Sequence, residues 1–110
     1  MLVYQTGRNQ QLVLSAYQTL LASGLSEREW QCLCLLSGGT DGEDGPTDAA
    51  GAIIDAEVHQ NACRQKLNPD EYLRRNDAYR FFDKTGGLLK TGPTGTNVCD
   101  LRVVVVNPIT

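Results

Sequence analysis

The chain has 110 residues, the length of a single domain, and its 41% hydrophobic and 21% charged residues exclude a disordered protein. Its net charge is −3 with no basic block, which excludes nucleic acid as the main partner. The opening residues lack a signal-peptide pattern, and the longest apolar run, Val103–Val106, is far too short to cross a membrane, so we expect a cytoplasmic protein without a membrane partner.

The first predicted element is a helix over residues 8–23, whose apolar residues recur at helical spacing and form one face. Gly24 follows, where a left-handed cap ends a helix. SEREW is expected to be a short connector. The continuous apolar run Gln31–Ser37 then predicts a buried strand.

Residues 50–55 predict a second short strand, and residues 57–67 predict a helix with apolar residues at spacings of four, one and four. The segment NPDEYLRR begins another helix, with Asn68 as its N-cap and a proline in the first turn.

The segment NDAYRFFDKTGG predicts a further helix that begins at Asn76 as N-cap and stops at two glycines. Its aromatic residues are expected to face the core, Tyr79 and Phe82 first and Phe81 as a further candidate.

The segment LLKTG predicts a short strand, and VCDLRVVVVNP predicts a closing strand. Four consecutive valines are typical of an interior strand that is covered on both faces. Because strands alternate with helices, we predict an α/β architecture with a mixed sheet.

The four cysteines are expected to be reduced and to act as small buried apolar residues, because Cys32 and Cys34 lie two apart on a strand and are poorly placed to bridge each other. With a single histidine in the chain, Cys-His zinc spacing is absent.

The first candidate site segment is TGRNQ, at the start of the first helix. A cation in the first turn opposes the helix dipole, so Arg8 is better tolerated if an anion also lies at that helix end. The alternative is a solvated arginine near the terminus of the chain.

The second segment is the acidic, glycine-rich loop SGGTDGEDGPTDAAG at residues 37–51. Loops of this length without regular structure are usually functional or disordered. Two Asp-Gly pairs suit turns with positive φ. The loop's oxygen ligands suit a hard divalent cation such as Mg²⁺, although not at EF-hand spacing: Asp41, Glu43, Asp44 and Asp48. The alternative is that these acids cap turns and the following helix.

The third segment is the turn TGPTGTN at residues 91–97. Small residues between two strands can direct several backbone N–H groups toward one anion. No Lys-Ser/Thr pair follows the glycines, so this is not a Walker A motif. The alternative is a plain turn between strands. Two glycine-rich loops at strand ends, near a helix N-terminus, are nevertheless typical of an α/β ligand site.

Four segments also resemble one known family: GRNQ before a helix, LSGGTDGEDGPTDAAGA after a strand, NDAYRFF, and LLKTGPTGTNVCDLRV. Together they resemble the C-terminal MOFRL domain of the glycerate 2-kinases, a family also labelled hydroxypyruvate reductase. The resemblance runs from Gly7 to Val106. We interpret residues 1–110 as one MOFRL-like domain, with residues 1–6 as a truncated lead-in strand or tail.

The resemblance implies a three-layer α/β/α sandwich with a mixed sheet. It also implies half of a two-domain enzyme that transfers the γ-phosphoryl group of ATP to glycerate, in a cleft shared with a larger Rossmann-like domain. ATP and Mg²⁺ are the cofactors implied, and a small hydroxy acid is the acceptor.

The site residues implied by the resemblance fall into three groups. Arg8 and Asp44 would be catalytic, and Asp41 and Asp44 would contact Mg²⁺. The remaining positions would bind phosphate or substrate: Asn9, Thr40, Asp41, Thr94, Gly95, Thr96 and Asn97.

The sequence also departs from the family pattern. The N-terminal domain with its catalytic lysine is absent, the lead-in to GRNQ is cut to MLVYQT, and Gln11 stands where the family has glutamate. We therefore expect a free-standing domain that supplies phosphate-binding and substrate-binding loops but does not catalyse alone. It would act beside a separate Rossmann-like kinase chain.

Two alternatives remain open at this point. The first is a non-catalytic interaction module that forms a homo-oligomer through a vacated sheet edge and the cleft face. The second is a sensor of a divalent cation or a small acid, built from the loop that contains Asp41 and Asp48.

Overall fold

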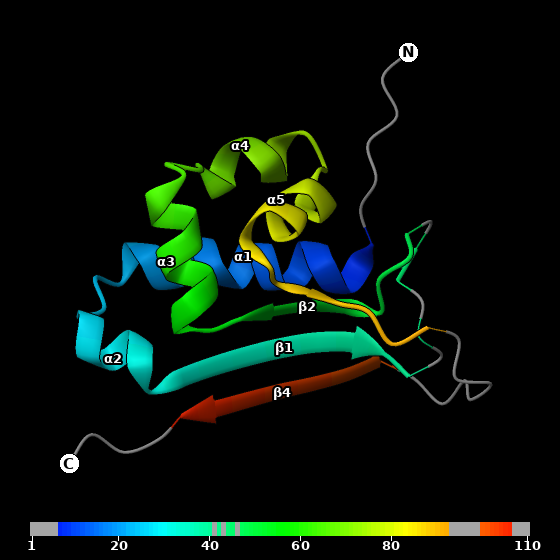
Figure 1. Ribbon diagram of the computed structural model, residues 1–110, viewed down its shortest axis with the longest axis horizontal. Coiled ribbons are helices and arrows are strands. Elements are labelled where there is room, and N and C mark those ends of the chain that lie inside the picture. Colours follow the sequence, from blue (N-terminus) through cyan, green and yellow to red (C-terminus); the bar gives the residue numbers. More distant parts are fainter. Residues whose placement is uncertain (1–6, 41, 43, 46, 93–99, 107–110) are drawn as a thin grey trace.

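The computed structural model describes residues 7–40, 42, 44, 45, 47–92 and 100–106. Its strands are β1 (Leu33–Gly39), β2 (Gly51–Ile54), β3 (Leu88–Leu89) and β4 (Asp100–Val106). Its helices are α1 (Arg8–Ala22), α2 (Glu27–Gln31), α3 (Ala56–Arg64), α4 (Pro69–Arg74) and α5 (Ala78–Thr85). Figure 1 shows α1, α3, α4 and α5 together beside the strands, with α2 at one end of the sheet.

The four strands form one sheet in the order β3-β2-β1-β4. Each neighbouring pair is antiparallel, with Leu35 opposite both Ile54 of β2 and Val104 of β4. The predicted α/β class is confirmed, whereas the mixed sheet is wrong for the described strands. Strand direction cannot be read from alternating elements. The loop between β1 and β2 returns the chain antiparallel without a crossover helix, and β3 also pairs antiparallel with β2 although three helices lie between them.

The core lies between α1, the sheet and the helices α3 to α5. Its largest fully buried side chains include Leu14 and Tyr17 of α1, Ile54 of β2 and two phenylalanines of α5, Phe81 and Phe82. Tyr17 and Phe81 have ring centroids 5.7 Å apart, and Phe81 meets Phe82 edge to face at 5.2 Å. Of the apolar face predicted for the first helix, Val13 and Tyr17 are buried in this core, whereas Leu12 and Leu21 stay exposed at 41% and 37%.

The predicted connector SEREW is in fact the beginning of α2. The Ser26 side chain accepts a hydrogen bond from the Glu29 backbone N–H, and the Glu29 carboxylate accepts one from the Ser26 backbone N–H, which together form a capping box. Trp30 then anchors this single turn in the core at 5% exposure. Local capping and one buried aromatic residue are enough to form a helix that the apolar pattern did not predict.

Helices α3 and α4 begin where the sequence indicated, within one or two residues. Asp55 caps α3 by accepting from the Val58 backbone N–H at 2.9 Å. Asn68 caps α4 by accepting from the Asp70 backbone N–H at 3.1 Å, as predicted. Short polar side chains at these positions satisfy backbone donors that have no partner within the helix.

Helix α5 corrects two predictions. Its N-cap is Asp77, whereas Asn76 has a left-handed backbone with φ of 51°. Phe81 and Phe82 are both fully buried, and Tyr79 is only half-buried because it points toward the loop after β1. Gly86 ends the helix in the left-handed conformation, as predicted.

Strand β4 is an edge strand of the described sheet, which overturns the prediction of an interior strand covered on both faces. Its valines are exposed, with Val104 at 61% and Val106 at 67%. A run of valines satisfies β-propensity at an edge as well as in an interior, so the run alone does not decide position.

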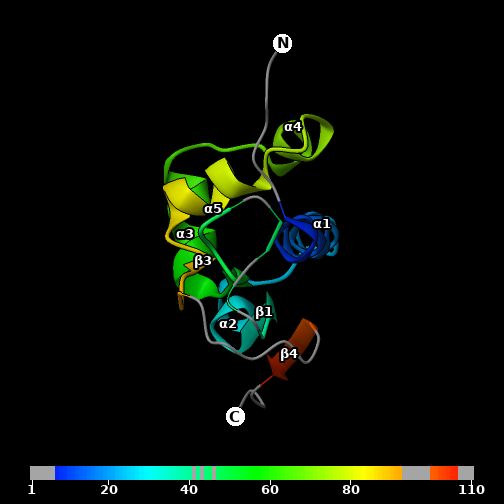
Figure 2. The ribbon, with the colours of Figure 1, turned by 90° about the vertical axis from the view of Figure 1, so that its right-hand side faces the viewer.

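The described helices leave one side of the sheet open. Figure 2 shows α1, α4 and α5 on the same side of the strands. The opposite face carries Cys34, Leu36 and Val105, which stay half-buried or exposed. A further helical layer on that face stays a prediction.

Candidate functional site

The predicted site lies where one end of α1 and one end of the sheet meet. Gly39 ends β1, Gly51 begins β2 and Leu89 ends β3, and the antiparallel pairing brings these positions to the same end of the sheet. The first turn of α1 lies at this same end of the molecule (Figure 1). The topology therefore brings together the two predicted segments TGRNQ and SGGTDGEDGPTDAAG.

Asp44 links the loop to α1. Its side chain accepts hydrogen bonds from the backbone N–H of Asn9 at 2.9 Å and of Gln10 at 2.8 Å, and from Asn9 Nδ2 at 3.2 Å. Asp44 is 3% exposed. The anion expected at this helix end is, in the structure, the carboxylate of Asp44, which is held by the helix dipole and by charge-assisted hydrogen bonds.

Gly7 is required at this junction because of its close approach to Asp44. A Cβ atom on Gly7 would lie 2.2 Å from the Asp44 carboxyl carbon. Gly7 is also the N-cap of α1 and makes no side-chain cap hydrogen bond. The loop carboxylate therefore caps the helix in place of a local side chain.

Asn9 and Gln10 extend this network toward β1 and the loop. Asn9 Oδ1 accepts a hydrogen bond from Ser37 Oγ at the end of β1. Gln10 Nε2 donates to Thr47 Oγ1 at 2.9 Å, and Thr47 Oγ1 donates to the Asp44 carbonyl oxygen at 2.8 Å. Asn9 is 2% exposed and Gln10 is fully buried, so both serve as internal links of the junction.

A second contact joins the two glycine-rich loops. Gly42 has φ of 85°, and a Cβ atom there would lie 2.0 Å from the Gly92 carbonyl oxygen. The backbone of the acidic loop thus lies directly against the start of the TGPTGTN turn. Gly45 has φ of 63°, so the glycine of each Asp-Gly pair adopts the positive φ that the sequence predicted.

A third contact, which the sequence did not reveal, lies on the surface beside the two loops. Asp48 accepts a hydrogen bond from the Tyr79 hydroxyl at 2.7 Å and forms an ion pair with Lys90 at 3.3 Å. The Tyr79 hydrogen bond, followed by Lys90, lowers the pKa of Asp48, and the interaction with Asp48 raises the pKa of Lys90. These residues connect the loop, α5 and the end of β3.

The other predicted site residues are placed as follows. Arg8 is exposed at the first position of α1, and Thr40 is half-buried at the start of the loop. The remaining predicted positions lie outside the described residues: Asp41, Glu43, Thr94, Gly95, Thr96 and Asn97. Among the described residues, no group of three His, Cys, Asp or Glu side chains is arranged to hold a metal ion.

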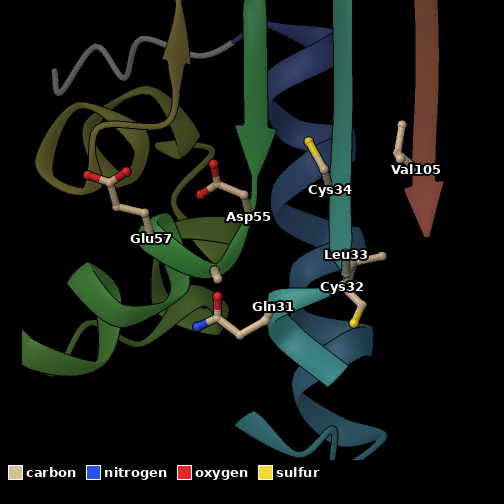
Figure 3. A pocket seen from close by; sticks show the side chains of 8 residues that line it. Gln31, Cys32, Leu33, Cys34, Asp55, Glu57 and Val105 are labelled. Atoms are coloured by element: carbon tan, nitrogen blue, oxygen red, sulfur yellow. The ribbon is translucent and has the colours of Figure 1, made fainter. Parts of the chain in front are cut away.

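The opposite end of the sheet has a separate hollow of about 330 Å³ that no sequence motif indicated. Figure 3 shows the Asp55 and Glu57 carboxylates on one side of this hollow, and Cys34 and Val105 on the other. Burial raises the pKa of the Cys34 thiol. The described cysteines Cys32, Cys34 and Cys63 are free, as predicted, but the predicted burial is wrong for them, since Cys32 and Cys34 are half-buried and Cys63 is exposed.

Comparison with known proteins decides the family. The MOFRL family profile matches residues 4–100. The chain belongs to the MOFRL family. It is 48% identical to the D-glycerate 2-kinase of Thermotoga maritima over 100 residues, and 40% identical to the human glycerate kinase over 109 residues.

Solved structures give the same relationship for this MOFRL domain. A glycerate kinase from Thermotoga maritima superposes with a TM-score of 0.81 at 44% identity over 96% of this chain. A protein from Pyrococcus horikoshii OT3 superposes with a TM-score of 0.79 at 35% identity.

The match covers only part of each relative. The chain matches 22% of the Thermotoga enzyme's sequence and 20% of the human one, although more than 90% of this chain is aligned in both cases. The MOFRL domain described here thus corresponds to about a fifth to a quarter of those proteins. None of its described helices combines the length and apolar character that a membrane span requires.

Proposed function

We propose that this MOFRL domain supplies one wall of a glycerate-kinase-type phosphoryl-transfer site and does not catalyse the reaction alone. The observation that carries the proposal is the contact between Gly42 and Gly92, where two glycine-rich loops lie against each other beside the N-terminus of α1. Backbone N–H groups in such loops bind phosphate oxygens because they are preoriented and carry partial positive charge.

Within this proposal, Arg8 and Asp44 have different tasks. Arg8 is exposed at the first turn of α1, where a guanidinium can form two hydrogen bonds to a phosphate. Asp44 is buried with its carboxylate bound by Asn9 and Gln10, so we assign it to positioning the loop on α1. Thr40 lies at the start of that loop and remains a proposed substrate contact.

ATP is the proposed phosphoryl donor and glycerate the proposed acceptor, since relatives that match over nearly the whole chain are named glycerate kinases. The described residues do not fit a Mg²⁺ site, because the Asp44 carboxylate is already bound by three N–H donors and none of the other acids that the structure describes gathers with it. We therefore derive no step through Mg²⁺ from these residues. Positioning of phosphates and exclusion of water require a second wall, which we propose is a Rossmann-like domain in the same compartment, the cytoplasm.

The test is an NMR titration of the isotope-labelled chain with a non-hydrolysable ATP analogue, with and without Mg²⁺, and separately with glycerate. We expect amide shifts at Arg8, Gly42 and Gly92, and few shifts in α2 at the far end of the sheet. Arg8→Gln should weaken the response to the nucleotide analogue. The matched control, Arg28→Gln on α2, should leave it unchanged. Absence of any loop shift at saturating ligand contradicts the proposal.

A further inference from the structure

The outer edge of β4 is long and is not blocked in the described part of the chain. β4 is the last strand in the sheet order and spans seven residues, whereas β3 at the opposite edge has two. Natural sheets usually protect an edge by a short strand, a proline, a bulge or inward charges. The second half of β4, Val103–Val106, has none of these.

The side chains of β4 are also unusually exposed for their type. The described chain has six exposed large hydrophobic residues, and four of them belong to β4: Leu101 at 55%, Val104 at 61%, Val105 at 45% and Val106 at 67%. Leu101 and Val105 lie on one face of the sheet, and Val104 and Val106 on the other. Exposed apolar residues concentrated on one edge strand mark an interaction surface rather than scattered surface positions.

We propose that this edge is occupied by β4 of a second copy of the chain, in antiparallel pairing about a twofold axis at Val103. In such a pair Val103 lies opposite Val103, and Leu101 lies opposite Val105 of the other copy. All seven residues of each strand are then paired, and the two sheets join into one continuous sheet. The backbone N–H and C=O groups on the outer edge become hydrogen-bonded.

Several registers keep each side chain on the same face of the joined sheet. Among them, the charges that come to lie opposite each other and the number of residues that are paired favour the register centred on Val103. An axis at Arg102 would place two like charges directly opposite, which is destabilising. An axis at Val104 would leave Leu101 without a partner. With the axis at Val103, Arg102 lies opposite Val104, so the edge is complementary to itself without opposing like charges.

A second copy also fits the face that the described helices leave open. Across the twofold axis, Leu101, Val103 and Val105 of one strand continue directly into the same residues of the other strand. Cys34 and Leu36 of β1 extend this apolar surface on each side, because they share that face. The net charge of −3 per chain opposes association only weakly. This inference does not rest on the proposed kinase function.

The first test is the molecular mass in solution, measured by light scattering over a range of protein concentrations. We expect a concentration-dependent shift from the monomer mass to twice that mass. Val103→Arg places two arginines opposite each other at the axis and should abolish the dimer. Leu21→Arg on α1, which also replaces an exposed apolar residue, should leave it intact. A monomer at every concentration overturns the proposal.

The second test reads the register directly and does not depend on a destabilising change. In a chain whose four native cysteines are replaced by serine, Val103→Cys should give a disulfide-linked dimer with a mild oxidant. Val104→Cys is the matched control, because Val104 lies opposite Arg102 and not opposite itself, and it should remain largely uncrosslinked. A dimer that resists Val103→Arg, or equal crosslinking at both positions, overturns the pairing of β4 with itself.

Discussion

The Asp44 carboxylate caps a helix that begins 36 residues earlier in the chain, accepting a hydrogen bond from the Gln10 backbone N–H at 2.8 Å. The interaction replaces a local N-cap, since Gly7 has no side chain to provide one. It also fixes the acidic loop at a defined distance from Arg8. One carboxylate therefore determines both the stability of α1 and the shape of the proposed site.

The first prediction concerns this buried carboxylate. Asp44→Asn removes the charge that the helix dipole stabilises and faces an amide donor toward backbone N–H groups. We expect the free energy of unfolding to fall by about 1–3 kcal/mol, measured by urea denaturation. Asp70→Asn, which removes a half-exposed ion pair with Arg74, should cost less than about 1 kcal/mol. Equal losses in the two variants would contradict the capping role of Asp44.

The sequence predicted the elements of this fold better than their arrangement. The four helix predictions rest on apolar spacing and caps, such as Asn68 and Gly86, and these interactions are local. The positions of β4 and of Tyr79 depend on contacts between distant segments. Neither a run of valines nor a single tyrosine shows which neighbour it meets, so both were assigned wrongly.

In the candidate site, too, the sequence predicted local features but not contacts between distant segments. Glycine-rich loops at strand ends could be predicted to meet, because that follows from chain connectivity and turn chemistry. The sequence could not show that Asp44 is buried against α1, since four acids in the loop have equivalent local surroundings. Lys90 was missed for a similar reason, because its partner Asp48 is distant in the chain.

The second prediction separates backbone conformation from close contact at the loop junction. Gly42 and Gly24 both have positive φ, but a Cβ atom has no neighbour within 4 Å at Gly24 and lies 2.0 Å from the Gly92 carbonyl oxygen at Gly42. Gly24→Ala should cost about 1–2 kcal/mol from backbone strain alone. Gly42→Ala should cost more and should shift the amide resonances of Thr91 and Gly92. A smaller loss at Gly42 than at Gly24 would show that the loops are not in contact in solution.

The third prediction concerns Asp48 and the surface contact with Tyr79. The Tyr79 hydroxyl is the largest cause of the lowered pKa of Asp48, and Lys90 adds to it. In Tyr79→Phe we expect the pKa of Asp48 to rise toward its ordinary value of 3.8, followed by NMR of the side-chain carboxyl. Lys90→Met should produce a smaller rise. If Lys90→Met has the larger effect, the ion pair and not the hydrogen bond holds the loop to the sheet.

The fourth prediction concerns pH and the single histidine of the chain. His59 stacks on Trp30 with centroids 3.9 Å apart, and its Nδ1 lies 2.8 Å from the Tyr17 hydroxyl. Burial lowers the pKa of His59, while Glu27 acts in the opposite direction. The folded state thus favours the neutral ring, and protonation favours unfolding.

The direction of the pH dependence of stability follows from the lowered pKa of His59. The stability that His59 contributes is fully present above its ordinary pKa of 6.5 and is lost as the pH falls through that value toward the lower pKa of the folded state. We expect the free energy of unfolding to decrease over this window in the natural chain. His59→Phe, which preserves an aromatic ring against Trp30, should remove that part of the pH dependence. NMR titration of the imidazole gives an independent check, and a pKa at or above 6.5 in the folded protein would contradict the prediction.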